Sequence, residues 1–443
     1  MEKFFNVKKL FLIFELFLCF GFVIIFSGSF QKESVEIVIH CNNEVVCWSE
    51  TKCLETEAID DLFKMQKRGF GTTHNERKDL VETIISMGFS TEDALNYVFP
   101  GLKQQINDLA KRIYVSPVDA KAKFAPNNNQ KFSYTNERNG AFIDKDELYN
   151  GILINLEKTN KIELNISPKT ILPKTTKKEL KEQTKLVSFF ETDYSHSSAS
   201  RKNNIHLALN AINGLKLEPN KEYSFNEITG RRTKEKGYKE ANIIVNNEYV
   251  EGFGGGVCQV STTLYNALLL ADVCVLESHP HSLESSYVMA GFDAMVNYGS
   301  SDLRFVNKKP YPQYVRAYHT NNKIGVEIYS SPLPYKITRK QIILSERSLP
   351  DVVVEDKTLL VGERRYTTIP KVGRKIKSCL EYSQNGKVIF TKTLRTQTYK
   401  PVQGILIVGT KQTGEDVNNN TFSSFINGDW LCKKYFEFFR KIC

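Results

Sequence analysis

A glycine-rich segment that ends in a cysteine constrains the fold of this chain more than any other feature. The run Gly252-Phe-Gly-Gly-Gly-Val-Cys258 holds four glycines in five residues. Apolar residues then recur at helical spacing from Val260 to Ala271, which predicts an amphipathic helix that begins near Cys258. A helix N-terminus favours a thiolate because its backbone N–H groups are unpaired and its dipole is positive there. The segment therefore predicts a nucleophilic cysteine; the alternative is a tight turn before a small buried residue.

Two histidines follow the predicted helix and are candidates for a catalytic base. The run Ser278-His-Pro-His-Ser282 comes directly after a short apolar strand, which would return toward the start of the helix. His279 and His281 alternate around Pro280, so in an extended chain they face the same side and either can serve Cys258. The same spacing would suit metal ligands, but we expect no metal site because no third ligand is evident.

A histidine base needs a carboxylate to orient it, and Asp293 is the first candidate. It follows Gly291-Phe292, a short way beyond the histidines. The alternative role for Asp293 is a turn residue that caps a strand. The other acidic residues near the histidines are Glu277, Glu284 and Asp302. His206 lies in a predicted helix, 195–213, beside core positions, so we expect it to be a packing residue.

The N-terminus predicts export. Lysines at positions 3, 8 and 9 precede an apolar run, Leu10–Phe26, that only Glu15 interrupts. We expect a retained signal anchor with the rest of the chain outside the cell; cleavage near Ser27-Gly28-Ser29 is the alternative. The net charge of +10 is spread along the chain without a basic block. We therefore expect no nucleic-acid partner and a location beside an anionic membrane or cell wall.

The nine cysteines predict neither zinc binding nor a cofactor, because no CxxC pair occurs. In an exported chain, Cys41, Cys47 and Cys53 leave room for one disulfide, and Cys432 with Cys443 for another. An odd count leaves at least one thiol free, and Cys258 is the candidate.

The sequence predicts an α+β, multi-domain ectodomain. Helical spacing dominates 75–113, and strand-like alternation fills 351–410, where Asn385-Gly386 predicts a hairpin turn. The lysine-rich stretch 174–185 reads as a linker or an exposed helix. The boundaries we expect are a signal segment 1–30, a cysteine-containing segment 31–80, a small α+β domain 81–187, an α+β domain 188–335, an all-β module 338–412 and a tail 413–443.

Several motifs together resemble the VanW domain. They are Tyr223-Ser-Phe-Asn-Glu227, Gly237-Tyr-Lys-Glu-Ala241, Gly254-Gly-Gly-Val-Cys-Gln-Val-Ser-Thr-Thr-Leu-Tyr-Asn266, His279-Pro-His-Ser282 and Tyr298-Gly-Ser300. The preceding domain, through Asn139-Gly-Ala-Phe-Ile-Asp144 and Ile171-Leu-Pro173, resembles the peptidoglycan-binding domain that commonly comes before VanW. The module that ends at Tyr399-Lys-Pro401 and Val408-Gly-Thr410 is similar to the extracellular G-five (G5) module.

The resemblance implies activity on peptidoglycan, because some VanW family members are regarded as L,D-transpeptidases. Cys258 would attack a tetrapeptide stem, release the terminal D-Ala and pass the acyl group to a neighbouring stem as a 3-3 cross-link. His281, His279 and Asp293 would assist. The residues implied to contact substrate are Gly254, Gly255, Gly256, Gln259, Ser261, Thr262, Arg232 and Tyr298.

Two departures from the family pattern bear on these roles. Arg231-Arg232-Thr233 stands where the family often has Pro-Arg-Thr, and Phe292-Asp-Ala-Met295 stands where it often has Arg-Asp-Ala-Thr. Arg232 remains available to bind the D-Ala carboxylate; the alternative is a surface or core-bridging arginine. The competing functions are a non-catalytic peptidoglycan-binding protein linked to glycopeptide tolerance and a cysteine hydrolase of wall peptides.

Overall fold

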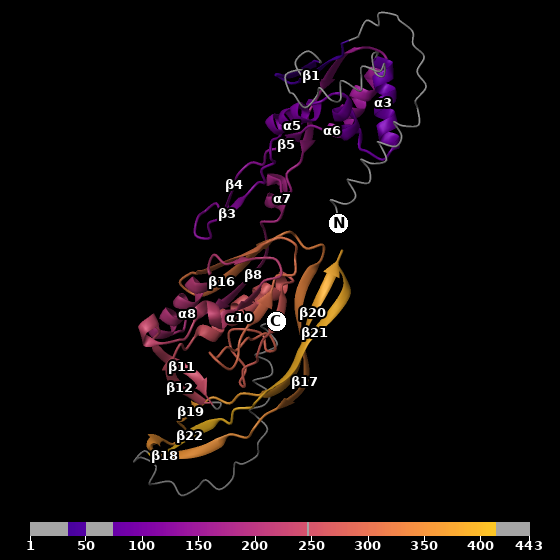
Figure 1. The fold of residues 1–443 in the computed structure, drawn as a ribbon. Helices are drawn as coiled ribbons and strands as arrows, with labels where there is room; N and C mark the ends of the chain where they lie inside the picture. The colour runs from indigo at the N-terminus through magenta and orange to yellow at the C-terminus, as the bar shows by residue number, and fades with distance from the viewer. Residues whose placement is uncertain (1–33, 50–73, 246–247, 413–443) are drawn as a thin grey trace, which may run out of the picture. The chain divides into compact units, whose positions relative to one another are not determined.

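The computed structural model describes residues 34–49, 74–245 and 248–412. The expected signal anchor 1–30, Cys53 and the tail 413–443 lie outside the described residues. Within the described part, no helix is both long and apolar enough to cross a membrane. The chain forms two compact units, one from residues up to 120 with 136–176 and one from 121–135 with the residues from 177 on (Figure 1).

The first unit packs helices against a small mixed sheet. Strand β1 lies between β2, which is antiparallel to it, and β6, which is parallel. The helical stretch predicted over 75–113 is confirmed but divided, because the chain turns at Gly88 and Gly101, both with positive φ. The elements are β1 (Glu36–Cys41), β2 (Glu44–Ser49), α3 (His74–Ser86), α4 (Thr91–Val98), α5 (Leu102–Ile113), β5 (Gly140–Phe142), α6 (Lys145–Leu156), β6 (Lys161–Ile166) and β7 (Lys169–Ile171).

Trp48 joins the sheet of the first unit to the corner between α4 and α5. Its side chain is buried and meets Phe99 edge to face, with ring centroids 5.1 Å apart. Its indole N–H donates to the Pro100 carbonyl at 2.9 Å. The ring thus fills the corner while its one polar group stays satisfied.

The second unit contains a central domain, residues 177–330, built on a four-stranded sheet of order β8-β16-β15-β9. Helices α8 and α10 pack against this sheet, and Ser188 of β8 donates to the Ala267 carbonyl of α10 at 2.7 Å. The elements of the main layer are α7 (Lys177–Glu182), β8 (Lys185–Asp193), α8 (Ala199–Ile212), β9 (Lys216–Leu217), α10 (Val257–Leu270), β15 (Gln313–His319) and β16 (Lys323–Ser330).

The sequence predicted both α8 and α10, but α10 is more deeply buried than predicted. The expected core positions of α8, Ile205, Leu209 and Ile212, are buried. The expectation that α10 is amphipathic is wrong, because every residue from Gln259 to Leu269 is buried. Strands β8 and β16, helix α8, strand β13 and strand β17 all contact it, so no face of α10 meets solvent.

Shorter elements surround the start of α10. They include the sheet β10-β14-β13 and the hairpin β11-β12. The elements are β10 (Glu222–Ser224), α9 (Phe225–Thr229), η3 (Lys234–Lys236), β11 (Glu240–Val245), β12 (Glu248–Phe253), β13 (Cys274–Glu277) and β14 (Arg304–Val306).

A hairpin from earlier in the chain belongs to the second unit. It is formed by β3 (Ala122–Phe124) and β4 (Phe132–Tyr134). Phe132 meets Tyr314 of β15 and Tyr329 of β16 with ring centroids 5.1 and 5.4 Å apart. Arg316 donates from Nε to the Pro126 carbonyl at 3.0 Å. The hairpin is thus held against the central sheet by aromatic packing and by the hydrogen bond from Arg316 to its backbone.

The β-module, residues 336–411, follows as two three-stranded sheets, β17-β20-β21 and β18-β22-β19. The predicted turn at Asn385-Gly386 is confirmed: both residues have positive φ and join β20 to β21. Ile337, Leu380 and Tyr382 belong to the hydrophobic core of the central domain, so the first sheet is part of that core. The strands are β17 (Lys336–Arg347), β18 (Val352–Leu360), β19 (Arg364–Thr368), β20 (Gly373–Gln384), β21 (Lys387–Tyr399) and β22 (Ile405–Lys411).

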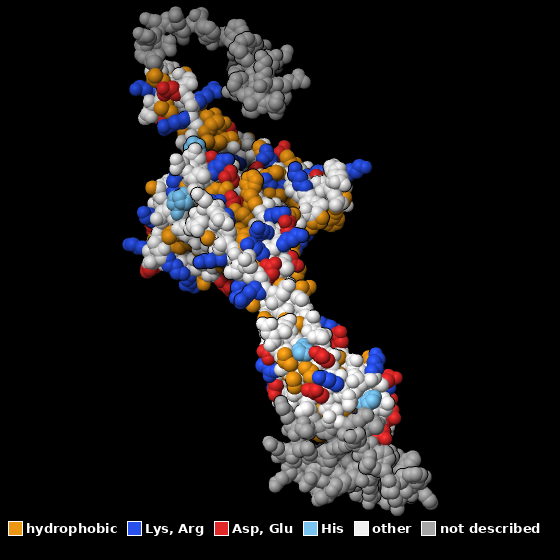
Figure 2. Space-filling model, turned by 90° about the horizontal axis from the view of Figure 1, so that it is seen from above, with side chains coloured by type: hydrophobic (Ala, Val, Ile, Leu, Met, Phe, Trp, Pro, Cys, Tyr) orange, Lys and Arg blue, Asp and Glu red, His pale blue; other side chains and the backbone are white. Residues whose placement is uncertain are grey.

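Lysine and arginine side chains lie interspersed with acidic ones over the face seen in Figure 2. Exposed ion pairs among the described residues include Lys169 with Glu147 at 2.6 Å and Arg304 with Glu222. Exposed pairs of this kind contribute little to stability, about 0 to 1 kcal/mol each.

Candidate active site

Cys258 lies at the N-terminus of α10, as predicted. The helix begins at Val257, and its N-cap, Gly256, has φ +105°. The thiol is free and partly buried, and Sγ donates to the Val296 carbonyl at 3.4 Å. Because Cys258 lies at the helix start, its sulfur is close to the positive end of the helix dipole, which favours a negative charge there.

The glycines before Cys258 are required by close packing as well as by backbone conformation. A Cβ on Gly254 would lie 2.8 Å from Cβ of Arg232, and one on Gly255 would lie 2.7 Å from the Asn242 carbonyl oxygen. A Cβ on Gly256 would lie 2.9 Å from side-chain atoms of Arg201 and Ile205. The run therefore lets neighbouring chain segments approach the start of α10.

We expect Gly256→Ala to lower the free energy of unfolding of the second unit by about 2–3 kcal/mol, since strain and overpacking add. Gly362 is the matched control: its φ is +96°, but nothing lies within 4 Å of an added Cβ. Gly362→Ala should cost about 1 kcal/mol, from backbone strain alone. Urea denaturation followed by near-ultraviolet circular dichroism measures both. Equal costs for the two variants would contradict the packing argument.

His281 is the histidine that faces the thiol. Its Nδ1 lies 2.7 Å from Oδ2 of Asp293, and its backbone N–H donates to the same oxygen at 2.6 Å. The ring is buried, with its side chain 8% exposed. Because Asp293 occupies Nδ1, Nε2 is the ring nitrogen left for Cys258, and the two groups interact closely enough to shift each other's pKa. The sequence reasoning left the base open between two histidines, and the structure brings His281 to the sulfur.

His279 points elsewhere. Its side chain is 38% exposed, and Nε2 lies 2.8 Å from Oε1 of Glu277. The expectation that the two histidines share a side is wrong, because the chain is not a regular strand there: only His279 forms a bridge, to Met295. His279 is thereby a surface partner of Glu277 rather than of Cys258.

Asp293 completes a Cys-His-Asp constellation and is fully buried. Its Oδ1 accepts from Tyr399 Oη at 2.6 Å, Arg395 Nη2 at 3.2 Å and Gln397 Nε2 at 3.3 Å. The alternative carboxylates have other partners: Glu277 pairs with His279, Glu284 with Arg374, and Asp302 with Ser224 and Asn226.

The charges of the site favour a thiolate beside an imidazolium. Burial alone would raise the pKa of Cys258, but the hydrogen bond and charge of His281, with the positive charge of Arg232, bring it below its ordinary value. Burial alone would lower the pKa of His281, but the phenol of Tyr287, the Asp293 carboxylate and Cys258 raise it well above its ordinary value. For Asp293, burial raises the pKa and the hydrogen bonds from His281 outweigh it, so the net shift is downward. These shifts favour the thiolate form of Cys258, which is the more reactive form of a cysteine.

Arg232 lies near the sulfur with half of its guanidinium unpaired. Nη2 donates to Asn226 Oδ1 at 2.7 Å, while Nη1 is buried without a hydrogen-bond partner. Burial lowers the pKa of Arg232 from its ordinary value, although the group remains cationic. Tyr298 is 44% exposed, and the Arg231 and Arg232 guanidinium carbons lie 5.3 and 6.0 Å from its ring centroid. Arg232 therefore keeps one buried, unpaired N–H group near the thiol.

Three residues expected to contact substrate are instead core residues of α10. Gln259 accepts from Arg201 and donates to the Asp193 carbonyl at 2.7 Å. Ser261 donates to the Ala294 carbonyl at 2.6 Å, and Thr262 accepts from the Ala294 N–H at 3.0 Å. All three are buried, which argues against direct substrate contact. Ser261 and Thr262 hold the Asp293 segment against α10, whereas Gln259 joins α10 to Arg201 of α8 and to the end of β8.

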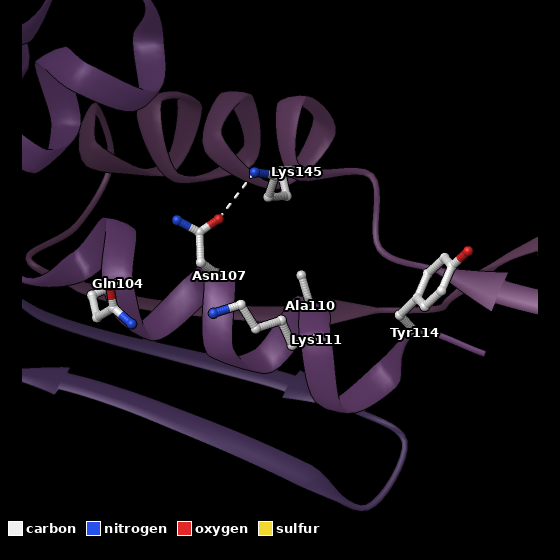
Figure 3. Close-up of a pocket in the computed structure, with 6 residues that line it drawn as sticks. All are labelled: Gln104, Asn107, Ala110, Lys111, Tyr114 and Lys145. Carbon is white, nitrogen blue, oxygen red and sulfur yellow. Dashed lines mark hydrogen bonds between the residues drawn. The ribbon is translucent and has the colours of Figure 1, made fainter. Parts of the chain in front are cut away.

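Other parts of the described chain offer less chemistry. No group of three or more His, Cys, Asp or Glu residues within the described ranges could hold a metal ion. An open pocket of about 480 Å³ lies in the first unit, between α5 and α6 (Figure 3). Its lining is polar, with Lys145 donating to Asn107 at 3.0 Å, and it contains neither a nucleophilic thiol nor a histidine. His206 hydrogen-bonds Tyr194 at 3.0 Å and stacks on His319, as a packing residue would.

Several site residues were not found from the sequence. They are Tyr287, Val296, Arg395, Gln397 and Tyr399. The last three alternate along strand β21. Polar residues repeated at every second position of a strand, on its buried face, are a sequence signal for a buried polar site. No sequence pattern places that strand beside residue 293.

Comparisons with known proteins agree on the central domain. Residues 200–329 match the family model described as VanW like protein. The uncharacterized protein YoaR of Bacillus subtilis is 40% identical over 151 residues, 34% of this chain and 50% of that protein. The vancomycin B-type resistance protein VanW of Enterococcus faecalis is 25% identical over 171 residues, 34% of this chain and 62% of that protein. The chain thus spans less than two thirds of the length of either relative.

Two solved G5 structures are each similar to a short part of the chain. A crystal structure of HP0197-G5 covers 17% of this chain and 99% of its own, with 25% identity and a TM-score of 0.10. The IgA1 protease G5 domain structure covers 17% and 93%, with 22% identity and a TM-score of 0.11.

Proposed function

Because the chain carries a VanW domain in which a cysteine, a histidine and an aspartate form one constellation, we propose that it is a cell-wall L,D-transpeptidase. One relative is named for vancomycin resistance, which supports a search among cell-wall peptides. The predicted N-terminal anchor supports a location at the outer face of the membrane, with peptidoglycan stems as substrate.

The observation that carries the proposal is the arrangement of Cys258, His281 and Asp293: His281 is hydrogen-bonded to the buried Asp293 and lowers the pKa of the Cys258 thiol. A protein that only binds stem peptides has no need of a thiol with a lowered pKa beside a buried imidazole. Perturbed, mutually coupled groups of this kind are typical of catalytic centres. They favour an enzyme over a binding protein.

The chemistry follows from the positions of these groups. The Cys258 thiolate attacks the carbonyl carbon of the third stem residue, and the positive end of the α10 dipole favours the oxyanion that forms. His281 gives its proton to the departing amine of D-Ala, which leaves a thioester on Sγ. The amine of a second stem then attacks the thioester and gives its proton to His281. Cys258 leaves as the thiolate, and a 3-3 amide bond remains.

Arg232 supports a donor stem that ends immediately after the bond to be broken. The unpaired Nη1 can bind a carboxylate, and its position near Cys258 suits the free carboxylate of a single departing residue. An enzyme that cuts within a longer peptide would have no carboxylate at that point. The arrangement therefore favours removal of a terminal residue.

We expect Arg232→Met, which keeps most of the packing against Gly254, to raise KM for the donor about 10- to 100-fold, the cost of a lost charged hydrogen bond. Cys258 should also react more slowly with anionic iodoacetate relative to neutral iodoacetamide. Arg231→Met is the matched control, since Arg231 is exposed beside the same Tyr298 ring. An unchanged KM and an unchanged reagent ratio would remove Arg232 from the binding site.

The proposal is tested by incubating the purified full-length chain with disaccharide-tetrapeptide and analysing the products by mass spectrometry. Disaccharide-peptide dimers with loss of D-Ala support transpeptidation. Tripeptide alone would replace the proposal with a carboxypeptidase, in which water is the acceptor. Unchanged substrate that nevertheless binds would replace it with a wall-binding protein.

A further inference from the structure

We propose that strand β21 of the β-module is a positioning element of the catalytic centre, and that Arg395, Gln397 and Tyr399 hold the Asp293 carboxylate for His281. This inference rests on the proposed function and adds to it: the module is part of the catalytic unit, not only an appended domain.

All three side chains are on one face of β21. Residues 395, 397 and 399 alternate with the exposed Thr396 and Thr398, so the face toward the central domain is polar and buried. Each of the three donates to the same atom, Asp293 Oδ1. The other oxygen, Oδ2, serves only His281 among these residues. The strand therefore fixes one side of the carboxylate and leaves the other side to the histidine.

Tyr399 is itself held on both sides. Its hydroxyl donates to Asp293 Oδ1 at 2.6 Å and accepts from the Gly291 N–H at 2.7 Å. Burial and the neighbouring carboxylate raise the pKa of Tyr399, so the phenol keeps the proton that it donates. Arg395 donates to the Asp293 backbone carbonyl as well, and from Nη1 to Ser278 at 3.3 Å. The two side chains thus bind the segments that precede both Asp293 and the histidines.

The backbone around β21 makes the same connection. The Lys400 N–H donates to the carbonyl of Ser282, directly after His281, at 3.0 Å. On the neighbouring strand β20, Arg374 Nη1 binds both oxygens of Glu284 at 3.0 and 3.1 Å. A Cβ on Gly291 would lie 3.0 Å from Ser378 Cβ, so the Asp293 segment rests directly on β20. Both loops of the site are therefore bound to one sheet of the module.

The chemistry explains why such support is needed. A fully buried carboxylate that lacks donors is protonated or reorients, and His281 then loses the partner that fixes its tautomer. With three donors on Oδ1, the carboxylate stays ionised and its second oxygen stays directed at Nδ1. Removing the donors therefore weakens the thiolate–imidazolium pair without touching Cys258 or His281.

The test uses the full-length chain with Arg395→Met and Tyr399→Phe, singly and together, and follows Cys258 alkylation by iodoacetamide against pH. We expect the double variant to be alkylated about 10-fold more slowly at pH 6, as for an upward shift of about one pH unit in thiolate formation. The single Tyr399→Phe variant, which keeps the ring in place, should be slowed about 3-fold. Peptide cross-linking should fall in parallel.

Tyr382→Phe is the matched control. Tyr382 lies on the same sheet, is also buried and donates to a carboxylate, Asp272, at 3.2 Å, beyond the end of α10 opposite Cys258. The Tyr382→Phe variant should lose stability, while the pH dependence of Cys258 alkylation should not change. A Tyr399→Phe protein that is destabilised but keeps the wild-type profile would overturn the inference, since its role would then be structural only. Alkylation needs no peptidoglycan, so it can be measured whether or not the chain is a transpeptidase. A wild-type chain without transpeptidase activity would therefore contradict the proposed function, while the alkylation experiment would still test the role of β21.

Discussion

Cys258→Ala is expected to abolish cross-linked dimers from disaccharide-tetrapeptide, with a rate at least about 10⁴-fold below that of the wild type. The physical reason is that no other group near His281 can form the acyl intermediate. Substrate should still bind, because Arg232 and the glycine segment are unchanged, so isothermal titration with the variant should show near-normal affinity. Loss of both turnover and binding would instead indicate a disturbed fold.

Cys274→Ala is the control for this result. Cys274 is a second free, partly buried thiol of the same domain, on β13, with no histidine bonded to it. Its replacement should leave dimer formation unchanged. Mass mapping after brief iodoacetamide treatment at pH 6 should find the label on Cys258 before Cys274, since His281 lowers the pKa of the Cys258 thiol. Dimer formation that survives Cys258→Ala would contradict the cysteine mechanism outright.

The two histidines should behave very differently despite their adjacency. His281→Asn is expected to lower kcat by about 10³-fold, the usual contribution of a positioned acid-base group. His279→Asn should change kcat less than about 3-fold, because an exposed ion pair with Glu277 is worth little. Steady-state cross-linking assays on both variants measure this contrast. Similar losses of kcat in the two variants would show that the hydrogen bond between His281 Nδ1 and Asp293 does not identify the catalytic base.

The pH dependence has a defined sign. The reactive thiolate–imidazolium pair exists above the lowered pKa of Cys258 and below the raised pKa of His281, so activity should rise on the acid side and fall on the alkaline side. In His281→Asn, the interaction that lowers the thiol pKa is gone. Thiol alkylation in that variant should be slow near neutral pH and recover only as the pH approaches about 8.5, the value of a free cysteine.

Much of the candidate site could be predicted because its signals are local. Four glycines before Cys258 and a helical pattern after it fix a helix start, and that start is where α10 begins. The nearness of His281 and Asp293 in sequence made both candidates. The choice of His281 over His279 could not be made, because the chain leaves the strand pattern after the bridge at His279 and strand alternation no longer applies.

The rest depends on contacts between distant segments. Tyr399 is 106 residues from Asp293, and nothing in either local pattern records that they meet. The burial of α10 on every side was missed for the same reason, since the β-module covers a face that would otherwise meet water. The resemblance implied that Gln259, Ser261 and Thr262 contact substrate, yet each satisfies a buried backbone or side-chain group. Polar residues in a helix that is wholly enclosed bond inward.

The buried indole of Trp48 makes tryptophan fluorescence a probe of the first unit. The sequence has two tryptophans, and Trp430 lies outside the described residues. The unit that holds Cys258, His281 and Asp293 contains no tryptophan in its described part, so its unfolding is nearly silent in indole emission. In a Trp430→Phe background, fluorescence at 295 nm excitation (about the wavelength that selects indole over phenol) would report the first unit alone. Thiol exposure would report the second, and the two melting curves could be read from one sample.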